Sequence, residues 1–355
     1  MQIRGGSSKG LYFKKEDLPS DEKERNRYIL LAMEGTLEGD PRQIDGLGGA
    51  NSLTSKVAVI SISDSPDIDL DYLFLQVVVG KGKVSLTQTC GNILAGIPHF
   101  AIETGLLKAG EVQTTVRIKL VNTGAVCEVT LDTPKGKILE RGNLKVDGVP
   151  ETAAPVICNY LYTAGATCGS LLPSGKAIDT ILGINLTCID NGMPVVIMLA
   201  SDFDLSGLES KEELEDNDEL KEKIEAIRLL AGKAMNLGDV SNKTIPKMCL
   251  ISKPVNGGAL TTRTFIPHVV HQSIGVLAAV SVGTACLISG SITQNIYDES
   301  LINGNSNSFS IEHPSGEFTV NLEYRKVNNN IEILKSGVLR TARILSKGEV
   351  YLPKA

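Results

Sequence analysis

Apolar and polar residues alternate over many short stretches of the chain, which is the pattern of half-buried β-strands. Several of these stretches are rich in Val and Ile, which favour extended backbone. The predicted strands are 56–62, 74–79, 112–121, 125–132, 195–200, 247–251, 319–325 and 349–352. Strands therefore outnumber helices in the predicted structure.

Four stretches repeat apolar residues at helical spacing instead. The first follows Ser20, whose hydroxyl can cap the free N–H groups of the first turn, and ends near Gly35. The second, 91–103, and the third, 267–282, have broad apolar faces and are expected to be buried. The fourth, 209–235, is rich in Glu and Lys, so we expect an amphipathic helix with a solvated face. Its apolar edge consists of Leu214, Leu220, Ile224, Ile227 and Leu230.

The two halves of the chain resemble each other. The run RGGSSKG at 4–10 resembles CGSLLPSGK at 168–176, and TSKVAVIS at 54–61 resembles IPKMCLIS at 245–252. Each of the two strands is followed later by one of the buried helices. A doubly wound sheet would need a helix after nearly every strand, so we predict a duplicated α+β unit.

The expected domains are residues 1–163 with 341–355, and residues 164–340. With 355 residues, the chain is long enough for each domain to bury its own core. Active sites of paired domains usually lie in the cleft between them, and we expect the site there.

Composition excludes several classes of function. The net charge of −6 and the 4% of aromatic residues argue against nucleic-acid binding. The sequence has neither an apolar N-terminal stretch nor a run of 18 apolar residues, so we expect no signal peptide, no membrane span and a cytoplasmic location. The expected partner is a small molecule, and the sequence leaves a homodimer open.

The sequence contains no motif for a metal or a nucleotide. The seven cysteines are odd in number and lack CxxC spacing, so we interpret them as reduced thiols. Four scattered histidines without an HExxH motif do not indicate a zinc site. The run 169–177 does not have P-loop spacing, and no GxGxxG follows a strand. We therefore expect no cofactor and no metal ion.

Two residues are candidates for acid–base chemistry. Cys90 precedes the second predicted helix, where free N–H groups favour a thiolate or a bound carboxylate; a buried cysteine at a tight turn is the alternative. Lys56 begins an apolar strand, where desolvation of an inward-facing amine favours a base. The alternative is a lysine at the strand end that reaches water.

Small and polar residues also gather in possible anion sites. Arg4, Ser7, Ser8 and Lys9 lie among glycines and form either an anion-binding nest or a hairpin turn. Gly91 and Asn92 would let a ligand approach the backbone and would offer it an amide. HPSG at 313–316 and RTAR at 340–343 are similar, weaker clusters.

Taken in order, these segments resemble the motif series of the PrpF-like isomerases, which include 2-methylaconitate cis-trans isomerase, 3-methylitaconate Δ-isomerase and 4-oxalomesaconate tautomerase. The motifs are RGGSSKG (4–10), DGLGGANSLTSK (45–56), TCGN (89–92), LPSGKAID (172–179), HPSG (313–316) and RTAR (340–343). The resemblance implies the diaminopimelate-epimerase fold, in which two similar α+β domains each wrap a curved, mostly antiparallel sheet around a long helix. It also implies cofactor-independent proton transfer on small unsaturated polycarboxylates.

By the same resemblance, Lys56 and Cys90 match the catalytic lysine and cysteine of the family. The implied reaction is an allylic 1,3-proton shift, with Lys56 as the main base and Cys90 donating a proton or fixing the substrate. The expected substrate-binding residues are Arg4, Ser7, Ser8, Lys9, Asn51, Gly91, Asn92, Ser174, Gly175, His271, Ser315 and Gly316.

Departures from the family pattern leave the substrate open. They include Ser7 and Thr89 in the first and third motifs, and Lys176, which either faces an extra carboxylate or faces solvent. An amino-acid racemase of the same fold would use a second cysteine, but 267–273 contains none and offers only His268 or His271 as a polar wall of the site. Both histidines can equally be ordinary helix-start residues. A non-catalytic polycarboxylate binder is the remaining alternative.

Overall fold

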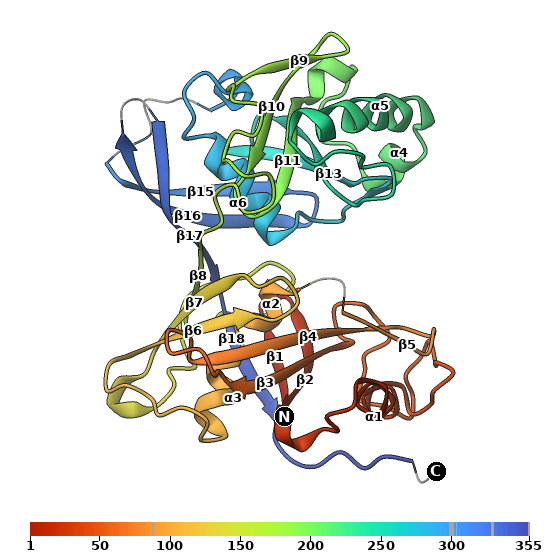
Figure 1. Cartoon of the computed structure of the whole chain (residues 1–355), viewed down its shortest axis with the longest axis vertical. Coiled ribbons are helices and arrows are strands. Elements are labelled where there is room, and N and C mark those ends of the chain that lie inside the picture. The colour runs from red at the N-terminus through yellow and green to blue at the C-terminus, as the bar shows by residue number, and fades with distance from the viewer. Residues whose placement is uncertain (87–88, 298–301, 303, 328–329, 354–355) are drawn as a thin grey trace. The chain divides into compact units, whose positions relative to one another are not determined.

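The computed structural model describes residues 1–86, 89–297, 302, 304–327 and 330–353 (Figure 1). They form an α+β structure with many strands and few helices, which confirms the predicted class. The chain divides into two compact units: unit 1 is Met1–Tyr160 with Leu339–Ala355, and unit 2 is Leu161–Val338. The boundaries expected from the sequence were 163/164 and 340/341.

Unit 1 is mainly a sheet with a few helices. Its strands are β1 (Gln2–Gly5), β2 (Ser8–Lys14), β3 (Lys56–Ile62), β4 (Leu70–Val78), β5 (Lys83–Ser85), β6 (Gln113–Leu120), β7 (Val126–Asp132) and β18 (Ala342–Ser346). Its helices are α1 (Glu22–Glu34), α2 (Gly91–Leu94) and α3 (Ile97–Glu103), with short 3₁₀ helices η1 (Lys15–Asp17) and η2 (Pro134–Gly136). Strands β8 (Val156–Leu161) and β17 (Asn330–Arg340) carry the chain from one unit to the other.

Unit 2 has the same composition of elements. Its strands are β9 (Asp179–Ile181), β10 (Ile184–Asp190), β11 (Pro194–Leu199), β12 (Lys247–Ser252), β13 (Leu260–Ile266), β14 (Val269–Val270), β15 (Ser306–His313) and β16 (Gly316–Val327). Its helices are α4 (Lys211–Glu215), α5 (Asp218–Ala234) and α6 (Val276–Ala285), with 3₁₀ helices η3 (Ala200–Phe203) and η4 (Ile292–Asn295).

Strand pairing confirms the duplication. In unit 1, β1–β2 is antiparallel, β2–β3 parallel, β3–β4 antiparallel, β4–β6 parallel and β6–β7 antiparallel. In unit 2, β10–β11, β11–β12, β12–β13, β13–β15 and β15–β16 repeat this order. The expected match between 54–61 and 245–252 therefore holds, since these segments contain β3 and β12. The match between 4–10 and 168–176 is wrong, because the hairpin β1–β2 corresponds to β10–β11.

The centre of unit 1 is the three-strand group β2–β3–β4, which is covered on both faces. One face packs against α1 in an apolar core that includes Leu11, Val57, Val59, Leu75, Val77, Ile29, Leu30 and Met33. The other face meets α2 and α3, where the Tyr12 hydroxyl donates to the Ile93 carbonyl at 2.6 Å and the Tyr12 ring lies 6.0 Å from that of Phe100. Burial on both faces explains why β3 is a continuous apolar run in the sequence.

The second predicted helix, 91–103, is wrong as a single element. The structure has α2 and α3 instead, separated at Ala95 and Gly96. Pro98 has no N–H to donate to the carbonyl of Leu94, so the helical hydrogen-bond ladder cannot continue through this position.

The other helix predictions need smaller corrections. The N-cap of α1 is Asp21, which accepts from Glu24 N, and not Ser20. The third helix begins at Val276, nine residues later than expected from 267, because β-branched residues at 269–270 pair with β13. The fourth is interrupted at Asn217, which caps α5.

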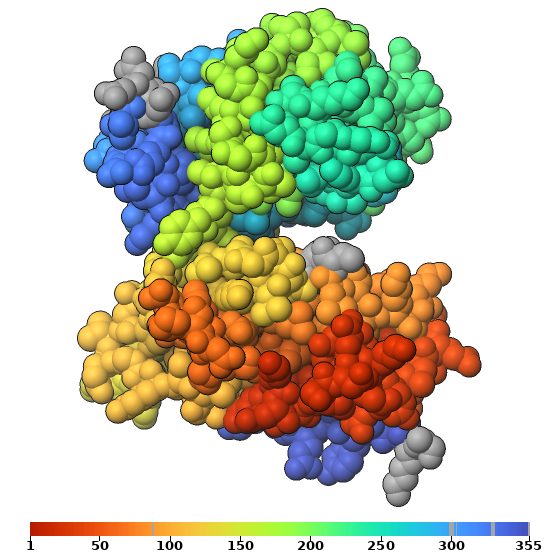
Figure 2. All heavy atoms as spheres, in the orientation of Figure 1, coloured from red at the N-terminus to blue at the C-terminus, as the bar shows by residue number. Residues whose placement is uncertain are grey.

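Two predictions for apolar residues were also wrong. Leu230, expected on the apolar edge of the fourth helix, is 43% exposed, whereas the other four residues of that edge are buried. Residues 349–352 form no strand, although Val350 and Leu352 pack against the core beside α1. Residues 342–353, the blue atoms below the red ones in Figure 2, thus lie against the N-terminal part of unit 1, where β18 also pairs with β1.

Candidate active site

The motif RGGSSKG forms the hairpin β1–β2, and its tip contacts Asn92 at the start of α2. Asn92 Nδ2 lies 3.2 Å from Ser7 Oγ and 3.4 Å from Ser8 Oγ. Gly6 has φ +49°, and a Cβ there would lie 2.2 Å from Asn92 Oδ1. Glycine is therefore required for this close approach. The hairpin interpretation of the motif is confirmed, and the hairpin brings Ser7, Ser8 and Asn92 together.

Arg4 and Lys9 lie in the same hairpin. Arg4 Nη1 donates to the carbonyls of Gly6 and Thr341 and to Thr341 Oγ1, each at 2.9 Å. Burial lowers the pKa of Arg4, and the nearby charge of Arg343 lowers it further. The main-chain N–H of Lys9 donates to the Leu53 carbonyl at 2.9 Å. These contacts fix the hairpin against β18 and the loop before β3.

Cys90 is half-buried and occupies the N-cap position of α2. Its carbonyl accepts from Leu94 N at 3.1 Å and from the Tyr72 hydroxyl at 3.3 Å. The sequence-based expectation for Cys90 relied on the positive end of a long helix at this point. Because α2 has only four residues, Cys90 lies at the start of a short helix and not of the long helix expected from the sequence.

Lys56 begins β3 and is 7% exposed, so the alternative of an amine that reaches water is wrong. Its Nζ donates to Gln76 Oε1 at 2.7 Å and lies 5.3 Å from the centre of the Phe74 ring. On the other side, Gly10 pairs with Lys56, and a Cβ at Gly10 would lie 2.3 Å from the Lys56 carbonyl oxygen. The last glycine of RGGSSKG thus lets β2 approach β3 beside the amine.

One face of β4 connects the two expected catalytic residues. Tyr72, Phe74 and Gln76 alternate along the strand and therefore share a face. Tyr72 contacts the Cys90 main chain, Gln76 holds Lys56, and the Tyr72 and Phe74 rings between them are 6.5 Å apart. Unit 1 therefore places Lys56 and Cys90 on the same side of its sheet.

Arg340 was not among the expected binding residues, but it lies beside the tip of the β1–β2 hairpin, next to Ser7, Ser8 and Asn92. It is 4% exposed, and a Cβ at Gly6 would lie 2.9 Å from its Cδ. Burial lowers the pKa of Arg340 to about 10, although its electrostatic interactions with Cys158, Tyr160 and Cys90 act in the opposite direction. The only sequence signal for it was the weak RTAR cluster. Its guanidinium is a buried positive charge beside the hairpin tip.

Asn51 and the pair Ser174–Gly175 lie in turns. Asn51 is exposed, and its Oδ1 accepts from Leu53 N at 2.8 Å. In unit 2, Ser174 Oγ accepts from Lys176 N at 3.3 Å, and the exposed Gly175 has φ +75°. Lys176 is exposed. The side chains of Asn51 and Ser174 thus bond within their own loops.

Gly91, another expected residue, is the first residue of α2 in unit 1. The expected residues His271, Ser315 and Gly316 form a second polar cluster, in unit 2. His271 Nδ1 accepts from Ser273 N at 2.9 Å, and Ser273 Oγ lies 3.2 Å from His313 Nε2. Ser315 N and Oγ both lie 3.3 Å from His313 Nδ1, and Gly316 pairs with His313 in the β15–β16 hairpin. Burial lowers the pKa of His271, and nearby lysines lower it further. Ser273 and His313, which join His271 to Ser315, were not among the expected binding residues, although His313 begins the HPSG motif.

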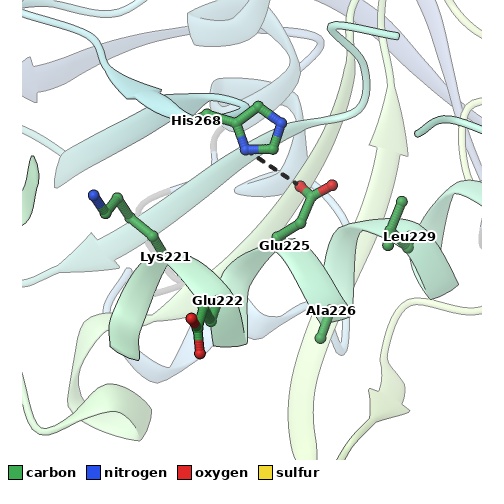
Figure 3. A pocket seen from close by; sticks show the side chains of 6 residues that line it. All are labelled: Lys221, Glu222, Glu225, Ala226, Leu229 and His268. Atoms are coloured by element: carbon green, nitrogen blue, oxygen red, sulfur yellow. Dashed lines mark ion pairs between the residues drawn. The ribbon is translucent and has the colours of Figure 1, made fainter. Parts of the chain in front are cut away.

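His268 belongs to a different environment, an open depression on the surface of α5 (Figure 3). Its Nδ1 lies 4.0 Å from Glu225 Oε2, which also binds Arg228 Nε at 2.6 Å. The depression is lined by Lys221, Glu222, Glu225, Ala226, Leu229 and His268. None of the expected catalytic or substrate-binding residues lies in it.

Within the described residues, no group of three or more His, Cys, Asp or Glu side chains is arranged to hold a metal ion. The same part of the chain contains no helix that is both long and apolar enough to span a membrane.

The family model for "PrpF protein" matches residues 1–353. The chain belongs to the PrpF family. It is 50% identical to the (4E)-oxalomesaconate Δ-isomerase of Novosphingobium sp. strain KA1, covering 99% of this chain and 96% of that protein. It is 49% identical to the 4-oxalomesaconate tautomerase of Pseudomonas putida, covering 99% and 94%. The 3-methylitaconate isomerase of Eubacterium barkeri is 32% identical, covering 99% and 96%.

A solved isomerase structure has the same fold. The crystal structure of a methylitaconate Δ-isomerase superposes with a TM-score of 0.85 at 30% identity and covers 99% of this chain and 94% of that one. A hydroxyproline epimerase from Agrobacterium vitis superposes with a TM-score of 0.52 at 12% identity, covering 98% and 90%, which shows a common epimerase-like fold alone. Together with the relatives above, these results show that the chain is an isomerase with an epimerase-like fold.

Proposed function

We propose that this PrpF-family isomerase acts on 4-oxalomesaconate, or on a closely similar unsaturated oxo-tricarboxylate, without a cofactor. The observation that supports this choice is the identity of 50% and 49%, over nearly the whole chain, with two proteins named for that compound. Identity with the proteins named for methylitaconate and methylaconitate is 32% and 30%.

The proposed reaction is a proton transfer on carbon. A C–H bond next to the C=C bond and the ketone breaks, its proton goes to Lys56 Nζ, and its electron pair delocalises over the C=C and C=O groups. The electron pair then takes a proton at the far alkene carbon, which moves the double bond, or at the ketone oxygen, which gives an enol. Both outcomes balance without any oxidant or reductant.

The residues described above in unit 1, which are Lys56, Cys90, Ser7, Ser8, Asn92 and Arg340, each have a proposed role. Lys56 is the base, and Cys90 returns a proton or fixes the substrate. Ser7, Ser8 and Asn92 offer hydroxyl and amide donors to a carboxylate, and Arg340 supplies a buried positive charge. Buried donors of this kind stabilise a delocalised anion more strongly than the same groups do in water.

The expected substrate-binding residues of unit 2 are also proposed to bind carboxylates of the substrate. His271, Ser315 and Gly316 are supported by their connection through His313. Ser174 and Gly175 are supported only by their place in the motif LPSGKAID.

A homodimer and a cytoplasmic location remain predictions of the sequence. Sedimentation of the purified protein tests whether it is a homodimer.

The alternative of a two-thiol racemase has no support in the second unit. The N-cap of α6, the buried helix of unit 2, is Gly275, whereas Cys90 occupies the N-cap of α2 in unit 1. Single-thiol chemistry therefore agrees better with the duplicated fold.

The test is solvent-deuterium exchange. The purified protein is incubated in D₂O with 4-oxalomesaconate, 3-methylitaconate or 2-methylaconitate, and NMR follows the exchange and the position of the double bond. We expect the fastest exchange with 4-oxalomesaconate. Faster exchange with another member of the panel contradicts the substrate, and binding without exchange on the whole panel contradicts the isomerase proposal.

A further inference from the structure

We propose that Gln76 is a positioning residue that holds the Lys56 amine for proton transfer. This inference rests on the proposed role of Lys56 as the base. It concerns a side chain that no motif of the sequence singled out.

The orientation of the Gln76 amide follows from its neighbours. Nε2 lies 3.0 Å from the Ser55 carbonyl oxygen, 3.0 Å from that of Val77 and 3.2 Å from that of Ser52. A flipped amide would place Oε1 against three carbonyl oxygens and Nε2 against an amine. Oε1 therefore faces Lys56 Nζ, and three main-chain groups hold it there.

The sheet determines which side chains meet. Lys56 and Gln76 are directly opposite in the antiparallel pair β3–β4, so their side chains lie on the same face. Both are 7% exposed, and the Phe74 ring lies 5.3 Å from Nζ. When the amine is neutral, one N–H donates to Oε1 at 2.7 Å, and the lone pair must therefore point away from Gln76. Gln76 thus sets the direction from which the amine can accept a proton.

The duplicated unit shows that the fold does not require this amide. Lys247 begins β12 as Lys56 begins β3. Met248 pairs with Phe265 of β13, so extending this register by one residue places Ile266 opposite Lys247. Lys247 Nζ donates to the Thr244 carbonyl at 2.6 Å instead. The same strand arrangement therefore forms with an apolar residue at the equivalent position. This comparison favours a chemical role for Gln76 over a structural one.

The experiment compares Gln76→Glu, Gln76→Leu and a matched control, Asn122→Asp. Asn122 is also an amide that clamps β4, through its bonds with Phe74 N at 2.8 Å and Phe74 O at 2.9 Å, but it faces no lysine in these contacts. Gln76→Glu keeps an acceptor at the amine and adds a negative charge, which stabilises an ammonium ion, but it also puts an oxygen in place of Nε2 against three carbonyl oxygens. Asn122→Asp makes the same change from donor to acceptor at Asn122 Nδ2, which bonds the Phe74 carbonyl, so it controls for that loss. All three variants leave in place the other titratable and charged groups described near this face, which are Tyr12, Tyr72, Cys90, His99, Arg4 and Arg340.

Two readouts are expected to change together. In Gln76→Glu, the acidic limb of the pH profile of kcat moves to higher pH by at least about one unit, and the rate recovers above it. In Gln76→Leu, kcat falls at least about tenfold while KM changes less than about threefold. Asn122→Asp lowers Tm but leaves the acidic limb at the wild-type pH.

NMR titration of the Lys56 ¹³Cε signal gives a readout that does not depend on activity. Its midpoint is expected to move to higher pH in Gln76→Glu and to stay unchanged in Asn122→Asp. If the wild type shows no exchange on the substrate panel, the proposed function fails while this titration still tests the contact. The inference is overturned if both Gln76 variants keep the wild-type kcat and pH profile, or if Asn122→Asp produces the same shift as Gln76→Glu.

Discussion

Asn92 and Ser7 are 85 positions apart in the chain, yet Asn92 Nδ2 lies 3.2 Å from Ser7 Oγ. This contact joins the start of α2 to the tip of the β1–β2 hairpin, and it places donors from two motifs at one point of unit 1.

Asn92→Asp is expected to weaken substrate binding. The substitution keeps the shape of the side chain but replaces the amide N–H donor with a negative charge beside the proposed carboxylate site. We expect KM for 4-oxalomesaconate to rise at least about tenfold, or about 1.4 kcal/mol. Steady-state kinetics measures this, and Asn26→Asp on α1 is the control for the same chemical change. An unchanged KM in Asn92→Asp would remove Asn92 from the binding site.

Cys90 is expected to be the one thiol that reacts readily. It is half-buried, whereas the other six cysteines are buried, and burial raises the pKa of Cys249 and Cys286 to about 12. Iodoacetamide should therefore label one thiol per chain and abolish turnover, and substrate should protect it. Mass spectrometry of the labelled peptide checks the position. Rapid labelling at another cysteine, or full activity after labelling of Cys90, would contradict its role.

Replacing the Cys90 thiol separates its two proposed roles. Cys90→Ser keeps the size of the side chain but replaces the thiol with a hydroxyl, which is a much weaker acid than a thiol. If the thiol moves a proton, kcat falls by about 100-fold or more with a smaller change in KM. If it only positions the substrate, the effect is mild and appears mainly in KM.

Arg340→Lys is expected to raise KM at least about tenfold. Lysine keeps the positive charge but loses the planar, bidentate donor geometry that suits a carboxylate. Arg343→Lys is the control, because Arg343 belongs to the same RTAR motif but is exposed. Circular dichroism and Tm show whether each variant folds. Equal effects of the two substitutions would contradict a specific role for Arg340.

His99 is expected to make the folded protein less stable in mild acid. It is 3% exposed on α3, and its burial, together with the nearby charge of Arg4, lowers its pKa to about 4. The unfolded chain keeps a value near 6.5, so it binds more protons between pH 6.5 and pH 4. The free energy of unfolding therefore falls by up to about 3 kcal/mol as the pH drops through this window.

Urea denaturation of the wild type and of His99→Gln at pH 7 and pH 4.5 checks this prediction. We expect the difference in unfolding free energy between the two pH values to be smaller in the variant. The same pH dependence in both proteins would show that another group is responsible.

The sequence was most informative where the determining interactions are local. The apolar run 56–62 is β3, and the chemistry of a lysine at its first position could be inferred from the neighbouring residues in the chain. Pro98 also carried a local signal, since a residue without an N–H breaks a helix, but the apolar periodicity of 91–103 outweighed it in the prediction.

Long-range pairing was not visible in the sequence. Gln76 lies in an apolar strand, and only the β3–β4 register places it opposite Lys56. Arg340 reaches the hairpin from the other end of the chain, and His313 joins Ser273 across 40 positions. Such contacts depend on the tertiary fold, so motif spacing could indicate the residues of the site but not their partners.

Lys56 is the proposed base that removes the proton moved in the isomerisation. The most direct measurement is deuterium incorporation into 4-oxalomesaconate in D₂O by Lys56→Ala, compared with the wild type and with Lys14→Ala, a surface lysine of β2 that pairs with Glu16. Lys56→Ala should lose at least about 100-fold in exchange rate, while Lys14→Ala should exchange as fast as the wild type. Exchange by a folded Lys56→Ala protein at the wild-type rate would contradict the role of Lys56 as the base.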